Sequence, residues 1–190
     1  MSSFCFVSSV FLNIDLKNPF VKVLLPILAI TAVLLISKKR FGLSYTQDLY
    51  LRRPPIDQLL LWLAIDMIWM LSTNYFVGWR GPWNFTPWIA QPLYVSILRV
   101  LAVCFLGPIS EELIFRGFLF SRLKKALPVN EWVIVIIIAA FWASIHYTYP
   151  LLVISIIFVD GVILGAALIR SRSLVIPMIM HICWNLYAIW

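Results

Sequence analysis

Charged residues are scarce in this chain, at 12% of its 190 residues against about a quarter in a typical soluble domain. Hydrophobic residues instead reach 63%, and the mean hydropathy is +0.96. This composition lies far outside the range of soluble globular proteins. It predicts an all-α, polytopic protein that is embedded in membrane lipid.

Several chemical signatures are also absent. The three cysteines lie in apolar surroundings without metal-ligand spacing, which indicates neither a disulfide nor a zinc site (Cys5, Cys104 and Cys183). No serine or cysteine occupies a recognised nucleophile motif, which argues against an acyl-enzyme. The net charge of +7 comes from short basic clusters between apolar runs, a pattern of membrane topology and not of nucleic-acid binding.

Apolar runs predict about six transmembrane helices. Residues 93–127 form one broken helix or two, because Gly107-Pro108 interrupts the run. The first 92 residues contain two spans and a surface loop over 78–92 without an assigned motif, and residues 93–190 form the second predicted part of the chain, which carries the motifs described below. The predicted runs are 19–37, 56–77, 93–106, 110–127, 132–147, 151–169 and 174–190.

The basic residues predict the orientation. If the spans alternate, ten of them lie on one side and three on the other, so the larger group is expected in the cytoplasm and both termini outside. The larger group is Lys38, Lys39, Arg40, Arg52, Arg53, Arg122, Lys124, Lys125, Arg170 and Arg172, and the smaller is Lys17, Lys22 and Arg80.

The segment Glu111-Glu112-Leu113-Ile114-Phe115-Arg116 places three charges in an apolar region. Glu112 and Arg116 are four residues apart and can pair on one helical face, while Glu111 points elsewhere. If a helix begins after Gly107, both glutamates lie near its N-terminus, where the helix dipole favours negative charge.

Polar residues from three helices are expected at one depth. Pro128 lies 16 residues after Glu112 and 18 before His146, or ~24 and ~27 Å of helix, so a hairpin at Pro128 brings them level. His181 and Asn185 share a face about halfway along the last span. Ionisable groups inside a bilayer are costly and usually functional.

These groups suit hydrolysis of a peptide bond. A glutamate and a histidine can hold a water molecule and take its proton, and a second histidine with an asparagine can donate to a developing oxyanion. Glu112 and Arg116 would support the site. A zinc-dependent version would use Glu111, Glu112, His146 and His181, but no H-E-x-x-H is present and Arg116 opposes a cation, so we expect no cofactor.

The motifs resemble those of the CAAX prenyl protease and bacteriocin-processing family. The resemblance covers about residues 95–190, and its motifs are Glu111-Glu112-xxx-Arg116, aromatic-xxx-His146, Phe158-xx-Gly161-xxx-Gly165 and Ser173-Leu174-xx-Pro177-xxx-His181-xxx-Asn185. It implies an all-α, glutamate-dependent intramembrane endopeptidase acting on a membrane-anchored or lipidated protein.

The resemblance also implies a role for each matching residue. Glu111 resembles the catalytic base and His146 its water-holding partner, His181 and Asn185 resemble the oxyanion site, and Glu112 and Arg116 support them. The family's phenylalanine four residues before the histidine is Trp142 here, so the aromatic character is kept.

Two other functions and three polar residues remain open. An immunity or assembly factor would keep the scaffold without turnover, although it need not keep every motif residue. A carrier using Glu111 and Asp66 would commonly show internal repeats, which are absent. Asp66 and Asp160 are expected to bind a buried arginine or backbone group, and Arg99 could pair with either.

Overall fold

The computed structural model describes residues 18–78 and 89–189, and within them every regular element is helical. Four helical stretches are long and apolar enough to cross a membrane: Pro19–Phe41, Ile56–Val77, Leu93–Ala126 and Leu151–Ser171. Two shorter apolar helices, Glu131–Ser144 and Val175–Ile189, complete the set. The chain is therefore an all-α, multi-pass membrane protein, as the composition predicts.

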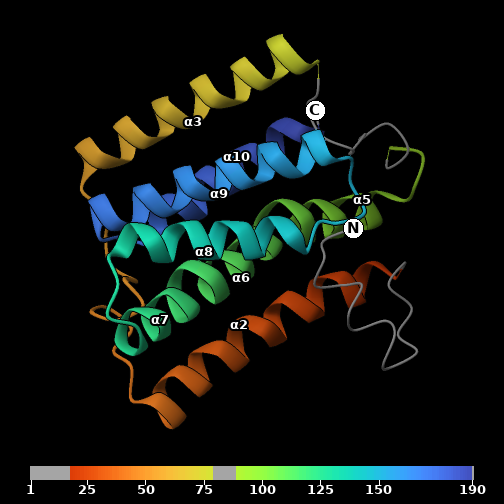
Figure 1. The fold of residues 1–190 in the computed structure, drawn as a ribbon. Coiled ribbons are helices and arrows are strands. Elements are labelled where there is room, and N and C mark those ends of the chain that lie inside the picture. The colour runs from red at the N-terminus through yellow and green to blue at the C-terminus, as the bar shows by residue number, and fades with distance from the viewer. Residues whose placement is uncertain (1–17, 79–88, 190) are drawn as a thin grey trace.

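The helices form one bundle in which α8 (Glu131–Ser144), α9 (Leu151–Ser171) and α10 (Val175–Ile189) lie centrally (Figure 1). Helix α2 (Pro19–Phe41) packs along the 93–126 stretch at one edge, and α3 (Ile56–Val77) packs on α9 and α10 at the opposite edge. Most of the 78–92 loop, with Arg80, lies outside the described residues, as do Lys17 and both terminal residues.

Helices α8 and α9 make the most extensive contact between described helices, and two glycines of α9 lie where they meet. A Cβ atom placed on Gly165 would lie 2.5 Å from Val135 Cγ1, and one on Gly161 would lie 3.1 Å from both Ala139 Cβ and Trp142 Cε3. Small residues let helices in lipid approach each other closely. The two glycines therefore bring the backbone of α9 against α8, with Gly161 at Ala139 and Trp142 and Gly165 at Val135.

The expected break at Gly107-Pro108 does not occur. Residues 93–126 form one continuous helix: α5 (Leu93–Val100), the π-helical segment η1 (Leu101–Leu106), α6 (Gly107–Glu112), the π-helical segment η2 (Leu113–Leu119) and α7 (Phe120–Ala126). The Gly107 N–H bonds to the Ala102 carbonyl five residues back, so the hydrogen-bond register has already shifted where Pro108 lacks a donor.

Two sequence expectations about the site helices are thus wrong. Glu111 and Glu112 do not lie at a helix N-terminus, because the helix begins well before them. Side chains, and not the free N–H groups of a helix end, therefore bind the two carboxylates. Helix α8 ends at Ser144, so His146 lies in the turn that follows and not within the span.

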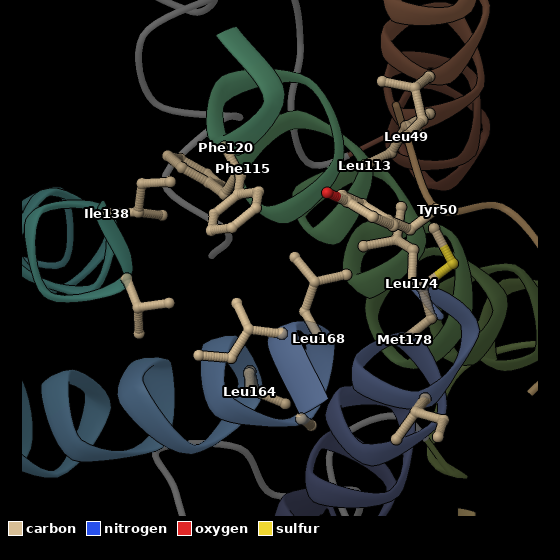
Figure 2. Close-up of a cluster of buried hydrophobic side chains, with 14 of the residues drawn as sticks. Leu49, Tyr50, Leu113, Phe115, Phe120, Ile138, Leu164, Leu168, Leu174 and Met178 are labelled. Carbon is tan, nitrogen blue, oxygen red and sulfur yellow. The ribbon is translucent and has the colours of Figure 1, made fainter. Parts of the chain in front are cut away.

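The loop between α2 and α3, residues 42–55, closes one end of the bundle. The Leu174 N–H donates to the Tyr50 carbonyl (2.8 Å), and Ser173 Oγ donates to the Arg52 carbonyl (2.8 Å). Lys125 pairs with Asp48 at 2.6 Å. Figure 2 shows Leu49 and Tyr50 of this loop packed among buried side chains of the core.

Basic residues gather at this same end. Glu131 binds Lys124 (2.6 Å) and Arg172 (2.8 Å), the Arg52 side chain donates to the Arg172 carbonyl (2.5 Å), and the Arg122 guanidinium lies 4.2 Å from the Phe41 ring centroid. The clusters that are expected to be cytoplasmic therefore lie side by side in the fold.

Candidate active site

The two adjacent glutamates are buried, with Glu111 8% exposed and Glu112 0% exposed. They are the last two residues of α6, which lies between the two π-helical segments of the long helix. Successive helical side chains differ in direction by about 100°, so neighbouring carboxylates can reach different partners. The structure gives each glutamate a separate set of contacts.

Glu112 is the centre of a buried ionic group. Its Oε1 atom lies 3.0 Å from an Arg116 guanidinium nitrogen and 2.9 Å from His181 Nδ1. The predicted Glu112–Arg116 pair is therefore confirmed. The other terminal nitrogen of Arg116 donates to the Gly161 carbonyl at 3.4 Å, and its guanidinium lies 4.4 Å from the Trp142 ring centroid. This group ties α6, η2, α9 and α10 together.

Glu111 is bound through Trp142 on α8. The indole Nε1–H donates to Glu111 Oε2 at 3.1 Å, and His146 Nδ1 lies 2.8 Å from the Trp142 backbone carbonyl. Within residues 18–78 and 89–189 no direct hydrogen bond joins Glu111 to His146. Trp142 holds both residues, so the hairpin at Pro128 does bring the glutamates and the second motif to one level, as the helix lengths predict.

The Trp142 carbonyl also decides which His146 nitrogen carries the proton. A carbonyl only accepts, so Nδ1 must be the donor, and Nε2 of the neutral ring keeps its lone pair. The imidazole ring stacks on the Tyr149 ring, with 6.0 Å between the ring centroids, and His146 is half-buried. His146 can therefore accept a hydrogen bond from a water molecule through Nε2.

Asn185 lies one turn after His181 on α10. Its side-chain Nδ2 donates to the Val103 carbonyl in η1 at 2.8 Å. An amide NH₂ has two donor hydrogens, so one remains for another acceptor. The bond fixes α10 against the π-helical segment and holds the third motif beside the first.

The sequence did not point to several of these contacts. Motif residues contact four such groups: the indole N–H of Trp142, the carbonyls of Gly161 and Val103, and the Tyr149 ring. Backbone carbonyls leave no trace in the sequence. Trp142 is the exception, because it stands where the family has a phenylalanine. Unlike phenylalanine, tryptophan has an N–H donor in its side chain.

Two further acidic residues are buried, but not as expected. Asp66 on α3 and Asp160 on α9 are 1% and 4% exposed. Neither oxygen of Asp66 has a hydrogen-bond partner among the described residues, nor does Oδ1 of Asp160. The expectation that each carboxylate is satisfied by an arginine or a backbone group is therefore wrong for these three atoms.

A metal ion is the alternative ligand for the same residues. In the part of the chain that the structure describes, no three His, Cys, Asp or Glu side chains form a group that could hold one metal ion. Arg116 also places a positive charge on the carboxylate that a cation would need. A cofactor-free site stays our expectation.

Substituting Trp142 with phenylalanine should weaken but not abolish activity of the site. Trp142→Phe removes the indole donor from Glu111 while keeping an aromatic ring beneath Arg116. A hydrogen bond to a charged group contributes roughly 1.5 kcal/mol, so any Glu111-dependent turnover should fall about tenfold. Steady-state rates test this, with Trp132→Phe at the exposed start of α8 as control. Equal loss in both variants, or none in either, would show that the Glu111 bond has no catalytic use.

Comparisons with known proteins place the chain. Residues 93–187 match the family model described as type II CAAX prenyl endopeptidase Rce1-like. An Escherichia coli protein named "Uncharacterized 24.3 kDa protein" is 30% identical over 86 residues, which cover 45% of this chain and 40% of that protein. No solved structure matches significantly. The family match spans half of the chain and contains all the motif residues, so the chain belongs to the Rce1-like family of type II CAAX prenyl endopeptidases.

Proposed function

We propose that the chain is an intramembrane endopeptidase that hydrolyses a peptide bond near the C-terminus or membrane anchor of a protein substrate. One observation carries the proposal: two neighbouring buried glutamates have different partners, one joined to Arg116 and His181 and the other facing Trp142 and His146. The first carboxylate binds both cationic partners through its Oε1 atom. The second accepts from a neutral donor, the Trp142 indole, among the described residues and is the better candidate for a base.

The chemistry requires one water molecule. Glu111 takes a proton from a water that also hydrogen-bonds to His146 Nε2, and the water oxygen attacks the carbonyl carbon of the substrate. His181 and Asn185 donate to the oxyanion that develops. Glu111 then returns the proton to the leaving nitrogen as the C–N bond breaks. The products are a carboxylic acid, which keeps the second proton of the water, and an amine. Glu112 and Arg116 hold His181 in place.

The substrate is a membrane-anchored or lipidated protein. The family name implies prenylated C-terminal motifs. The charge distribution favours a second class of substrate, an exported protein with a C-terminal sorting tail. The basic end of the bundle would be cytoplasmic. The turn that carries His146 follows the opposite end of α8 and would then lie nearer the outer face. Labelling from the cytosol of a cysteine introduced at Tyr149 would reverse this orientation.

Purified protein in proteoliposomes tests the proposal. We would supply one peptide with a prenylated C-terminal motif and one single-span peptide with a C-terminal tail, in water enriched in ¹⁸O. Hydrolysis should place one ¹⁸O atom in the new carboxylate of the preferred peptide, which mass spectrometry detects. If neither peptide is cleaved over a range of lipids and sequences, a non-catalytic membrane factor becomes the better interpretation.

A further inference from the structure

The basic end of the bundle has cations that its own carboxylates do not neutralise. Asp48 and Glu131 are ion-paired there to three basic residues, which are Lys124, Lys125 and Arg172. Another basic group forms no ion pair within residues 18–78 and 89–189. Its members, which we call the α2–α7 cluster, are Lys38, Lys39 and Arg40 in the last turn of α2 and Arg122 in α7. Their charge is therefore available to a partner from outside the chain.

The α2–α7 cluster meets at one aromatic ring. The guanidinium carbons of Arg122 and Arg40 lie 4.2 and 5.8 Å from the centroid of the Phe41 ring. The same ring packs on the Phe118 ring of η2, with 5.5 Å between the centroids. Figure 1 shows the end of α2 and α7 at the same end of the bundle. Two segments far apart in the sequence thus bring their cations to one place.

The helix dipole accounts for part of the cluster but not for Arg122. Cations in the last turn of a helix are stabilised by its dipole, which suits the three basic residues that end α2. Arg122 lies before the last turn of its own helix, where Lys124 and Lys125 stand. It is half-buried, and no described residue accepts a hydrogen bond from its guanidinium. Contact with the face of a ring leaves the N–H groups at the edge of the guanidinium free to bind an anion.

The surface beside the cluster is apolar. Phe41 is 37% exposed, and Leu35 and Ile36, about one turn earlier on α2, are each 47% exposed. Helix α2 is long and apolar enough to cross a membrane, so these side chains face lipid. A ligand that fits both surfaces needs an anionic head and apolar chains. Inorganic phosphate lacks the chains, whereas an anionic phospholipid has both.

We propose that the α2–α7 cluster binds the phosphate of an anionic phospholipid whose acyl chains lie along α2. Arg122 and Arg40 donate N–H groups to the phosphate oxygens, since a guanidinium matches phosphate geometry. Lys38 and Lys39 add positive charge at the membrane surface. The bound lipid joins α2, at the edge of the bundle, to the long helix that carries the two glutamates. The inference goes beyond the proposed function and does not depend on it.

Native mass spectrometry of the full-length chain tests the proposal. The chain is released from nanodiscs that contain equal amounts of phosphatidylglycerol and phosphatidylcholine with identical acyl chains. We expect the natural protein to retain at least about tenfold more phosphatidylglycerol than phosphatidylcholine. Arg122→Gln should lower the retention of phosphatidylglycerol about fivefold, which is the contribution of one basic residue near an anionic lipid surface. The retention of phosphatidylcholine should not change.

Two further variants separate the site from general surface charge and from folding. Arg53→Gln removes the same charge from an exposed residue at the same end of the bundle and should keep the full preference for phosphatidylglycerol. Arg122→Lys keeps the charge without the planar donor group, and should retain more phosphatidylglycerol than Arg122→Gln. Because the readout is a ratio of two lipids bound to one protein, a change in stability alone does not move it.

Three results would overturn the inference. The first is equal retention of the two lipids by the natural protein. The second is an equal loss of phosphatidylglycerol in Arg122→Gln and Arg53→Gln, which would show that diffuse surface charge holds the lipid. The third is displacement of phosphatidylglycerol by an excess of inorganic phosphate, which would indicate a site for the free anion. All three are measured without a peptide substrate, so they do not bear on the proposed peptidase activity.

Discussion

Glu111→Gln should abolish peptide cleavage while leaving the protein folded and inserted in the membrane. The amide keeps an oxygen that can accept the Trp142 indole N–H, now 3.1 Å from the carboxylate, so the local packing should persist. It cannot take a proton from water. General-base catalysis contributes about 10²- to 10⁴-fold, and cleavage should fall by at least that factor.

The matched control for this variant is Glu131→Gln, which makes the same chemical change at the basic end of the bundle. Its carboxylate binds Lys124 and Arg172, away from the motif residues. Cleavage by this variant should stay within about twofold of the natural protein, since these partly exposed ion pairs lie at the opposite end from the motif residues and contribute little. Undiminished cleavage by Glu111→Gln would falsify the assignment of Glu111 as the base and move attention to Glu112.

Glu112→Leu should produce the largest loss of stability. The glutamate is 0% exposed and Arg116 is 1% exposed, so the substitution leaves a guanidinium buried without its carboxylate. Breaking one side of a buried ion pair costs about 3–5 kcal/mol. His181 also loses its partner, so activity should disappear together with stability. Unfolding in detergent, followed by tryptophan fluorescence, measures the change.

A double substitution isolates the pair. Replacing both Glu112 and Arg116 by leucine removes the unpaired charge, and should recover a large part of the free energy of unfolding but no activity. Lys125→Ala is the control, because it breaks the ion pair between Lys125 and Asp48, whose side chains are 49% and 21% exposed, respectively. The free energy of unfolding should fall by at most about 1 kcal/mol. Equal losses in the single and double leucine variants would show that the two charges are not coupled.

Much of this arrangement is readable in the sequence because it depends on spacing. The apolar run 56–77 coincides with α3, and Glu112 and Arg116 pair as four-residue spacing predicts. The level meeting of Glu111 with the second motif follows from helix lengths on either side of Pro128. Such features need only local geometry and the exclusion of charge from lipid.

Other features depend on contacts that spacing does not determine. Pro108 interrupts a helix in most contexts, but here the register shifts to five-residue hydrogen bonds in η1 and the helix continues. The partner of His181 is Glu112, and one Asn185 donor is used by a backbone carbonyl. Each outcome is set by how neighbouring helices pack, and a single sequence does not report that.

The loop over residues 42–55 has a consequence for what counts as the functional unit. The match to the family model begins at residue 93, but the fully buried Leu174 amide would lose its acceptor if Tyr50 were removed, and Ser173 would lose its bond to Arg52. The part of the chain that matches the family model is therefore shorter than the part whose contacts hold the fold together. Residues 93–190 made alone should be digested by added protease faster than the same residues within the whole chain.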